Sequence, residues 1–206
     1  MELAFFVTAF ATLFVVIDPI GLMPMFVALT RGADAAHRRR IARHASLTAA
    51  GILLAFTIFG EALLGFIGIS MSAFRIAGGI LLLLTALDML FDRRAKRRES
   101  QIEDLPDPSV FPLATPLIAG PGSIASMILL MGQTQTTMES TALIGVMLAV
   151  LLLVYLSFLS GNTVERLLGH TGINVITRLL GMLLAALSIQ FMLDGIFALD
   201  WASLTR

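Results

Sequence analysis

Residues 3–29 read LAFFVTAFATLFVVIDPIGLMPMFVAL, an apolar run with a single charged residue, Asp18, near its centre. A membrane-spanning helix needs about 20 mainly apolar residues, so this run is long enough to cross a bilayer. Asp before Pro is also typical of a helix start, with Asp as the N-cap and Pro at the first helical position. The sequence therefore predicts one span made of two half-helices, the first ending near Ile17 and the second starting at Pro19.

The composition of the whole chain supports a membrane protein. Of the 206 residues, 57% are hydrophobic and 14% are charged, whereas soluble domains are about 25% charged. A soluble globule or a disordered chain is excluded, because neither accommodates so much apolar surface. The chain has no cysteine, which excludes disulfides and thiolate sites. Its 14 basic and 14 acidic residues balance, so the net charge indicates no partner.

Five more apolar runs follow the first. Strict alternation of apolar and polar residues is absent, so helices are favoured over a β-barrel. We expect an all-α membrane protein with six transmembrane helices in a lipid bilayer, at approximately Leu3–Leu29, Ala45–Phe66, Ser72–Phe91, Phe111–Met131, Thr141–Ser160 and Ile173–Leu193.

Basic residues in the connecting segments predict the orientation. Arginines cluster at 31–43 after the first run, Lys and Arg cluster at 93–98 after the third, and Arg166 follows the fifth. The alternate loops, 65–71 and 132–139, contain neither Lys nor Arg. Because cytoplasmic loops carry the excess of Lys and Arg, both termini are expected outside. The same rule explains the basic tract at 93–98, so no nucleic-acid partner is expected.

The two halves of the chain resemble each other. Leu63–Ser70 matches Leu167–Asn174 at an offset of 104, and Arg75–Gly78 matches Arg178–Gly181 at 103. Asp18-Pro19 aligns with Gly120-Pro121 at 102. Each half contains three predicted spans, and an odd number makes the second half enter the membrane from the opposite side. We therefore expect two inverted three-helix repeats, an architecture typical of secondary transporters. They would be residues 1–91 and 110–206, joined by a charged cytoplasmic linker at 92–109.

The fourth span carries a second break, Ala119-Gly120-Pro121-Gly122-Ser123. Inversion would bring the N-termini of both second half-helices together near the midplane. Helix N-termini favour anions, while the freed carbonyls and Asp18 favour cations, so the pair suits a zwitterion. A role of Asp18 as a helix cap alone is the alternative. The predicted substrate-binding residues are Asp18, Pro19, Ile20, Gly21, Pro24, Ala119, Gly120, Pro121, Gly122 and Ser123. Secondary candidates are Arg75, Gly78, Gly79, Arg178 and Gln190.

Several of these motifs resemble one family. The segments are Asp18–Phe26, Arg75–Gly79, Phe111–Ile124, and Arg178–Gly181 with Gln190 and Gly195. Together they are similar to the signatures of the MarC family of bacterial and archaeal inner-membrane proteins, over essentially the whole chain. The resemblance implies six spans, termini outside an inner (plasma) membrane, and transport of small neutral amino acids such as glycine and alanine.

These observations lead to a secondary transporter for small neutral amino acids, working by alternating access. The alternatives are a channel or permease for another small solute, and a non-transporting scaffold or sensor in which the breaks serve packing. No Walker, HExxH or GxSxG motif occurs, so the chain is expected not to be an enzyme and to hold no metal or cofactor. Coupling to protons or sodium, the direction of transport and the oligomeric state are left open by the sequence.

Overall fold

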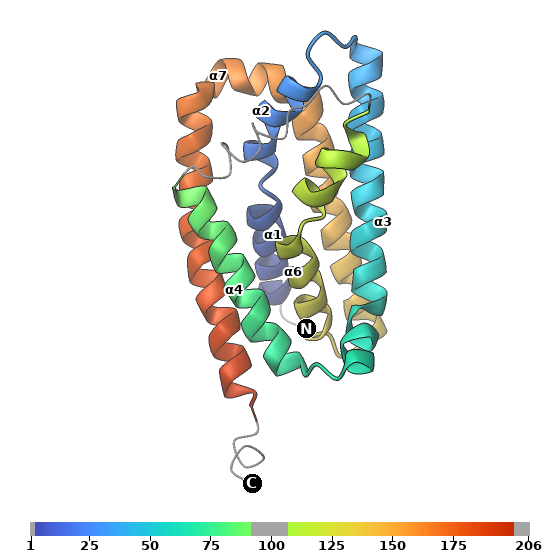
Figure 1. The fold of residues 1–206 in the computed structure, drawn as a ribbon, viewed down its shortest axis with the longest axis vertical. Helices are drawn as coiled ribbons and strands as arrows, with labels where there is room; N and C mark the ends of the chain where they lie inside the picture. The colour runs from blue at the N-terminus through green and yellow to red at the C-terminus, as the bar shows by residue number, and fades with distance from the viewer. Residues whose placement is uncertain (1–2, 92–106, 200–206) are drawn as a thin grey trace.

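The structure, a computed structural model, describes residues 3–91 and 107–199. All regular elements in these ranges are helices, which confirms the all-α prediction. In chain order they are α1 (Leu3–Ile17), α2 (Pro19–Leu29), α3 (Ala35–Ile67), α4 (Met71–Leu90), the π-helix η1 (Ser109–Ile118), α6 (Pro121–Met131) and α7 (Thr137–Phe197). Figure 1 shows the long helices side by side along the long axis of the molecule.

Five helical segments are long and apolar enough to cross a membrane, and a bent pair supplies a sixth. The five are Leu3–Leu29, Ala35–Ile67, Met71–Leu90, Thr137–Gly161 and Thr171–Phe197. The pair consists of η1 and α6, which meet at a bend of 54°. These segments correspond one for one to the runs predicted from the sequence. The predicted linker lies outside the described residues up to Pro106, and η1 already begins at Ser109, two residues before the predicted fourth span.

The second span starts earlier than predicted. Helix α3 begins at Ala35 rather than at Ala45, because Asp34 caps it by accepting a hydrogen bond of 2.7 Å from the N–H of His37. The arginines at 38–43 therefore lie in the first turns of a helix and not in a loop. Hydropathy marks where a helix enters the bilayer, whereas the cap decides where the helix itself begins.

The loop predicted between the fifth and sixth spans is helical over most of its length. Helix α7 begins at Thr137 and continues to Phe197 with one non-helical residue, Gly169 (φ 63°). Thr136 caps it, because its hydroxyl accepts the N–H of Glu139. Figure 1 shows α7 rising through the bundle, crossing its upper end and descending along the opposite side. The positive φ of Gly169 allows the reversal of direction.

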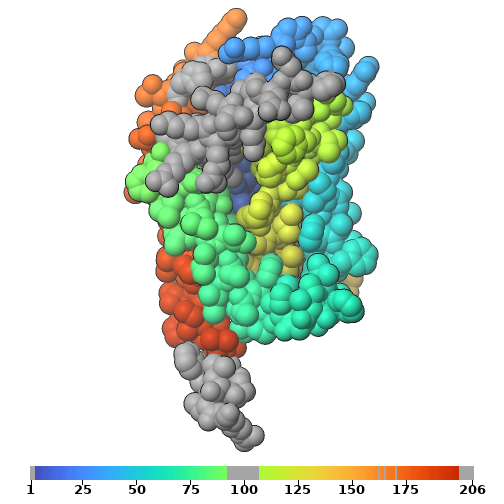
Figure 2. Space-filling model, viewed as in Figure 1, coloured from blue at the N-terminus to red at the C-terminus, as the bar shows by residue number. Residues whose placement is uncertain are grey.

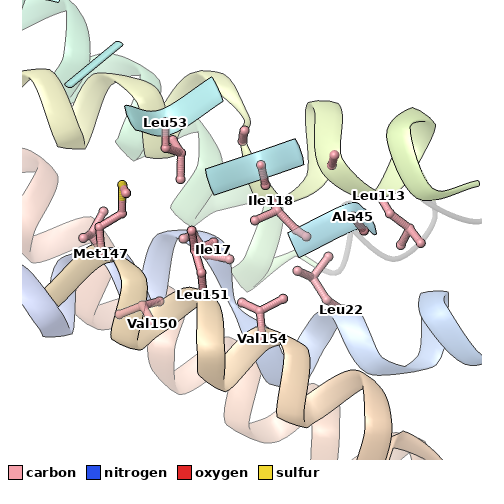
Figure 3. Close-up of a cluster of buried hydrophobic side chains, with 14 of the residues drawn as sticks. Ile17, Leu22, Ala45, Leu53, Leu113, Ile118, Met147, Val150, Leu151 and Val154 are labelled. Atoms are coloured by element: carbon pink, nitrogen blue, oxygen red, sulfur yellow. The ribbon is translucent and has the colours of Figure 1, made fainter. Parts of the chain in front are cut away.

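The interior is apolar and the outer face is apolar too. The larger core joins the first span, α3, η1 and the rising part of α7 through residues such as Ile17, Leu53 and Leu151 (Figure 3). A second core joins the end of α1 to α4, α6 and the descending part of α7. Many leucines and phenylalanines on the outside of the helices are exposed, as a protein surrounded by lipid requires.

Candidate functional site

The first break lies at Asp18, as predicted. Asp18 has φ 58° and ψ 66°, and it is the only non-glycine residue in the described ranges with a positive φ. Its backbone N–H still bonds the Phe14 carbonyl at 2.9 Å, and its carbonyl accepts the N–H of Leu22 at 3.0 Å. The two half-helices therefore remain part of one span, Leu3–Leu29.

The residues at this break suit its geometry. The left-handed conformation is tolerated by Asp and Asn better than by other side chains, and Pro19 is the favoured first helical residue. The Oδ1 of Asp18 accepts a hydrogen bond of 3.0 Å from the N–H of Gly21, which satisfies one free donor of α2. A Cβ on Gly21 would overlap the Asp18 carboxylate. Asp18 is fully buried, so this cap works in an apolar interior.

The second break lies at Gly120, also as predicted. Gly120 is the extended N-cap residue of α6, and Pro121 is its first helical residue. The hydroxyl of Ser123 accepts the Gly120 N–H at 3.0 Å and lies 2.7 Å from the carbonyl of Ile118, to which it donates. A Cβ on Gly120 would overlap the Pro116 carbonyl. At both breaks a side chain thus accepts a backbone N–H at the helix start. At the first break the side chain belongs to the N-cap residue Asp18, and at the second it belongs to Ser123, inside α6.

The two breaks adjoin each other. Gly122, the second residue of α6, faces Val16, two residues before Asp18: a Cβ on Gly122 would lie 3.2 Å from the Val16 Cγ1. The same position is 3.4 Å from the Leu82 Cδ2 and 3.5 Å from the Thr85 hydroxyl, both on α4. Figure 1 shows α1 beside α6 at this level, with α2 and α6 leading away in opposite directions.

The charges of the helix ends are complementary at this contact. The N-terminus of α6 carries roughly half a positive charge and backbone N–H donors, and the C-terminus of α1 carries roughly half a negative charge. Pro19 has no N–H to offer the Val15 carbonyl four residues before it. The N-terminus of α6 therefore lies beside the C-terminal end of α1, two residues before Asp18.

Most residues of the two breaks are buried. Figure 2 shows a hollow between α4 and the η1–α6 pair, with atoms of the first span, in dark blue, at its floor. Gly122 and Ser123 are buried, whereas Ile20, Gly21 and Pro24 are half-buried. Pro121 is exposed, and Pro19, Ala119 and Gly120 are buried.

The secondary candidates do not gather at the breaks. Gly78 packs on Leu129 of α6, and Gly79 packs on Ser188 and Met192 of α7, so both allow helices to approach closely. Arg75 is half-buried beside Gly195. Arg178 and Gln190 are exposed on α7. Within the described residues, no group of three or more His, Asp or Glu side chains could hold a metal ion.

Two hydroxyl residues near the breaks were missed by the sequence analysis. Thr85 faces Gly122 from α4. Its polar side chain follows a run of leucines, and this contrast could have indicated it from the sequence. Thr12 of α1 is fully buried, and its hydroxyl has no hydrogen-bond partner among the described residues. Thr12 precedes Val16 by one helical turn, and no feature of the surrounding apolar sequence indicates that it lies near a break.

Comparisons with known proteins cover nearly the whole chain. Residues 3–199 match a family described as MarC family integral membrane protein. A UPF0056 membrane protein of Methanocaldococcus jannaschii, MJ1677, is 39% identical over 200 residues, covering 95% of this chain and 98% of that protein.

Relatives also occur in bacteria. The UPF0056 membrane protein YvbG of Bacillus subtilis is 36% identical and covers 95% of this chain and 96% of its own length. A UPF0056 membrane protein of Aquifex aeolicus is 36% identical, with 93% and 92% covered. No solved structure matches this chain. The full-length family match and these relatives show that the chain is a multi-pass integral membrane protein of the MarC family, also termed UPF0056.

Proposed function

We propose that this protein is a secondary transporter that moves small neutral amino acids, such as glycine and alanine, by alternating access. The observation that carries the proposal is the contact between Gly122 and Val16, which joins two broken spans beside the fully buried Asp18. Broken helices that meet within the membrane are the usual site architecture of secondary transporters. The proposal includes no enzymatic step and no resident cofactor.

The substrate class follows from the groups at the breaks. Backbone N–H groups at the N-termini of α2 and α6 suit a carboxylate, because they add hydrogen bonds to a positive helix end. The Asp18 carboxylate and the carbonyls at the end of α1 suit an ammonium group. A small α-amino acid carries both groups on one carbon, and the close approach of Val16, Leu82 and Thr85 to Gly122 favours a small side chain.

The proposal includes two inverted three-helix repeats, and paired contacts support them. Gly60 of α3 packs on Ile128 of α6, and Gly161 of α7 packs on Val27 of α2. Adding 101 to the residue numbers of Gly60 and Val27 gives Gly161 and Ile128. The contact between Gly60 and Ile128 in one arrangement of the halves therefore recurs between Gly161 and Val27 with the two halves exchanged. Gly68 and Gly169, which both have a positive φ where one span turns into the next, are separated by the same number, whereas the sequence match of Leu63–Ser70 with Leu167–Asn174 has an offset of 104.

A second pair of contacts is reciprocal in the same way. Gly79 of α4 packs against the Ser188 carbonyl of α7, and Gly181 of α7 packs against the Ala86 carbonyl of α4. Adding 102 to Gly79 and to Ala86 gives Gly181 and Ser188, so the contacts pair Gly181 with Gly79, whereas the sequence match pairs Gly181 with Gly78. A contact of i with j that recurs as j with i is expected across a two-fold axis.

The proposed orientation places both termini outside the plasma membrane. The start of α1 and the end of α7 lie toward the same, lower end of the bundle in Figure 1, and the start of α3 lies at the opposite end. Basic segments face the cytoplasm, so the upper end would be cytoplasmic. Coupling to protons or to sodium is part of the proposal, and the coupling ion is for experiment to identify.

Counterflow in proteoliposomes tests the function. Vesicles loaded with unlabelled alanine or glycine should accumulate the labelled amino acid, and excess unlabelled substrate should saturate the exchange. Gly122→Leu and Gly120→Leu should abolish exchange while inserting normally, because neither position has room for a side chain. Gly145→Leu is the matched control, since nothing lies within 4 Å of a Cβ there. Absence of exchange for every small amino acid, or ion current without saturable exchange, would refute the proposal.

A further inference from the structure

A polar pair lies on the outward side of the descending part of α7. The Nε2 of Gln190 donates a hydrogen bond of 2.7 Å to the Oδ1 of Asp194, one turn further along the helix. Gln190 is exposed, and the face around it includes the exposed apolar residues Leu183 and Leu193. This pair takes no part in the contacts at the helix breaks.

The contacts between α4 and α7 give the depth of Gln190. Gly79 of α4 lies against Ser188 and Met192, which flank Gln190. Helix α4 has 20 residues, about the length that spans the hydrocarbon, and Gly79 is near its middle. Gln190 is therefore near the centre of the membrane. Arg178 differs, because Gly181 lies level with Ala86 and Met89 near the end of α4, so the Arg178 side chain can reach the headgroups.

A glutamine at this depth is costly when it faces lipid. Its amide has two N–H donors and an oxygen acceptor, and the bond to Asp194 uses only one donor. Hydrocarbon offers no partner for the others, whereas another helix with a polar side chain at the same depth does. The position of Gln190 therefore points to a protein neighbour on this face.

The residues around Gln190 have the spacing of a helix-pairing surface. Six of the exposed residues form a stripe in which members follow one another at intervals of four and three positions, namely Leu179, Leu183, Ala186, Gln190, Leu193 and Phe197. This spacing is the heptad pattern of two helices packed at a small angle. Ala186 sits next to Gln190 in the stripe, where a small side chain allows the helix axes to approach.

We propose that this stripe is the interface between two copies of the chain, with Gln190 of each copy bonded to Gln190 of the other. A two-fold axis along the membrane normal places identical residues at identical depth. The glutamine amide is self-complementary, because it both donates and accepts. A second copy therefore satisfies both glutamines at once. The inference is independent of the transported substrate.

Cysteine crosslinking tests the interface in native membranes. The chain has no cysteine, so any disulfide must involve an introduced one. Leu183→Cys and Leu193→Cys should each give a covalent dimer on oxidation. Leu63→Cys is the matched control, because Leu63 is similarly exposed near the outer end of α3, on another face. Dimers absent from the stripe, or equally abundant in the control, would overturn the proposal, as would a crosslink to a different protein.

Replacing Gln190 distinguishes a specific interface from random collisions of crowded copies in the membrane, because only the specific interface should depend on the Gln190 side chain. In the Leu193→Cys background, Gln190→Leu should lower the crosslinked yield by about fivefold, the effect expected from losing an interhelical amide bond in a membrane. Gln190→Asn should retain most of the yield, because it keeps donor and acceptor. Single-molecule photobleaching of labelled protein in dilute bilayers should show two-step traces for the wild type and mostly single steps for Gln190→Leu. An unchanged yield and unchanged step counts in Gln190→Leu would refute the role of Gln190.

Discussion

The Gly21 N–H donates to the Asp18 carboxylate at 3.0 Å, and the same carboxylate fills the space that a side chain on Gly21 would need. The two residues are therefore coupled: Asp18 holds a left-handed conformation in which its side chain reaches back over the first turn of α2, and only glycine leaves room for it. This relationship makes the first break a local structure whose parts can be tested one at a time.

Replacing Gly21 by Ala should destabilise the protein by about 1–2 kcal/mol, because the new Cβ displaces the Asp18 carboxylate and removes the cap. Gly51→Ala is the control within α3, where nothing lies within 4 Å of a Cβ. Alanine there should be neutral or stabilise by up to about 1 kcal/mol. Thermal unfolding in detergent measures both variants. Equal stability of the two would show that the Asp18 cap contributes little.

Variants of Asp18 should rank by how well they cap and how well they tolerate a positive φ. Asp18→Asn keeps an acceptor and tolerates the left-handed conformation, so its stability should stay close to wild type. Asp18→Gly loses the hydrogen-bond acceptor only. Asp18→Ala loses the acceptor and is also destabilised by roughly 1 kcal/mol or more, because alanine is strained in the left-handed conformation. The same unfolding assay should give the order Asn, Gly, Ala. If Ala were as stable as Asn, Asp18 would not act as a cap.

Removing the Ser123 hydroxyl should destabilise the second break. Ser123→Ala leaves the buried Gly120 N–H and the Ile118 carbonyl without the hydroxyl, at a cost of about 1–3 kcal/mol. Ser160→Ala serves as the control, because the Ser160 hydroxyl bonds the Leu156 carbonyl on an exposed helix surface and its loss should cost less than about 0.5 kcal/mol. Chemical denaturation of both variants compares them. Similar losses in the two would contradict this account of the break.

Alanine at Gly79 or Gly181 should push α4 and the descending part of α7 apart. A Cβ on Gly79 would lie 2.8 Å from the Ser188 carbonyl, and one on Gly181 would lie 2.9 Å from the Met89 Cβ. Each substitution should cost about 1–3 kcal/mol, the usual range for overpacking. Gly145→Ala, with open space around it, should leave the unfolding temperature unchanged or raise it slightly. A loss confined to one of the two glycines would argue against the reciprocal contact.

The stacked rings of Phe26 and Phe158 should be energetically coupled. Their centroids are 4.4 Å apart with an interplanar angle of 6°, and both side chains are fully buried. Each single change to Ala should cost about 3–5 kcal/mol, and the double-mutant cycle should give a coupling of about 0.5–1.5 kcal/mol. Phe10 and Phe14 stack on α1, where Phe10 is exposed, so Phe10→Ala should cost much less. A coupling near zero would show that the α2–α7 contact is loose.

The positions of both breaks could be predicted because they depend on local chemistry. Proline has no N–H and favours the first helical position, and Asp or Gly before it suits an N-cap, wherever the chain packs. The starts at Pro19 and Pro121 were therefore predicted correctly. The start of α3 was not predicted correctly, because hydropathy locates the bilayer and the cap at Asp34 lies eleven residues before the apolar run at Ala45.

Which residues face each other could not be predicted in the same way. A soluble helix shows its buried face by apolar residues that recur every three to four positions among polar ones, but spans such as α4 are apolar on nearly every side. Their rotation is therefore not visible in the sequence. The role of Gly79 as a packing position on α7, the approach of Thr85 to Gly122 and the exposure of Gln190 all follow from that rotation.

The sequence by itself determined that the chain is a helical membrane protein, how many runs can span the bilayer, and where two of them break, because apolar length and backbone chemistry act within a few residues. Only the tertiary structure decided that Gly122 meets Val16 and that Gln190 points outward. Those contacts depend on how helices approach and rotate, and close fits at glycines such as Gly79 and Gly181 decide that rotation.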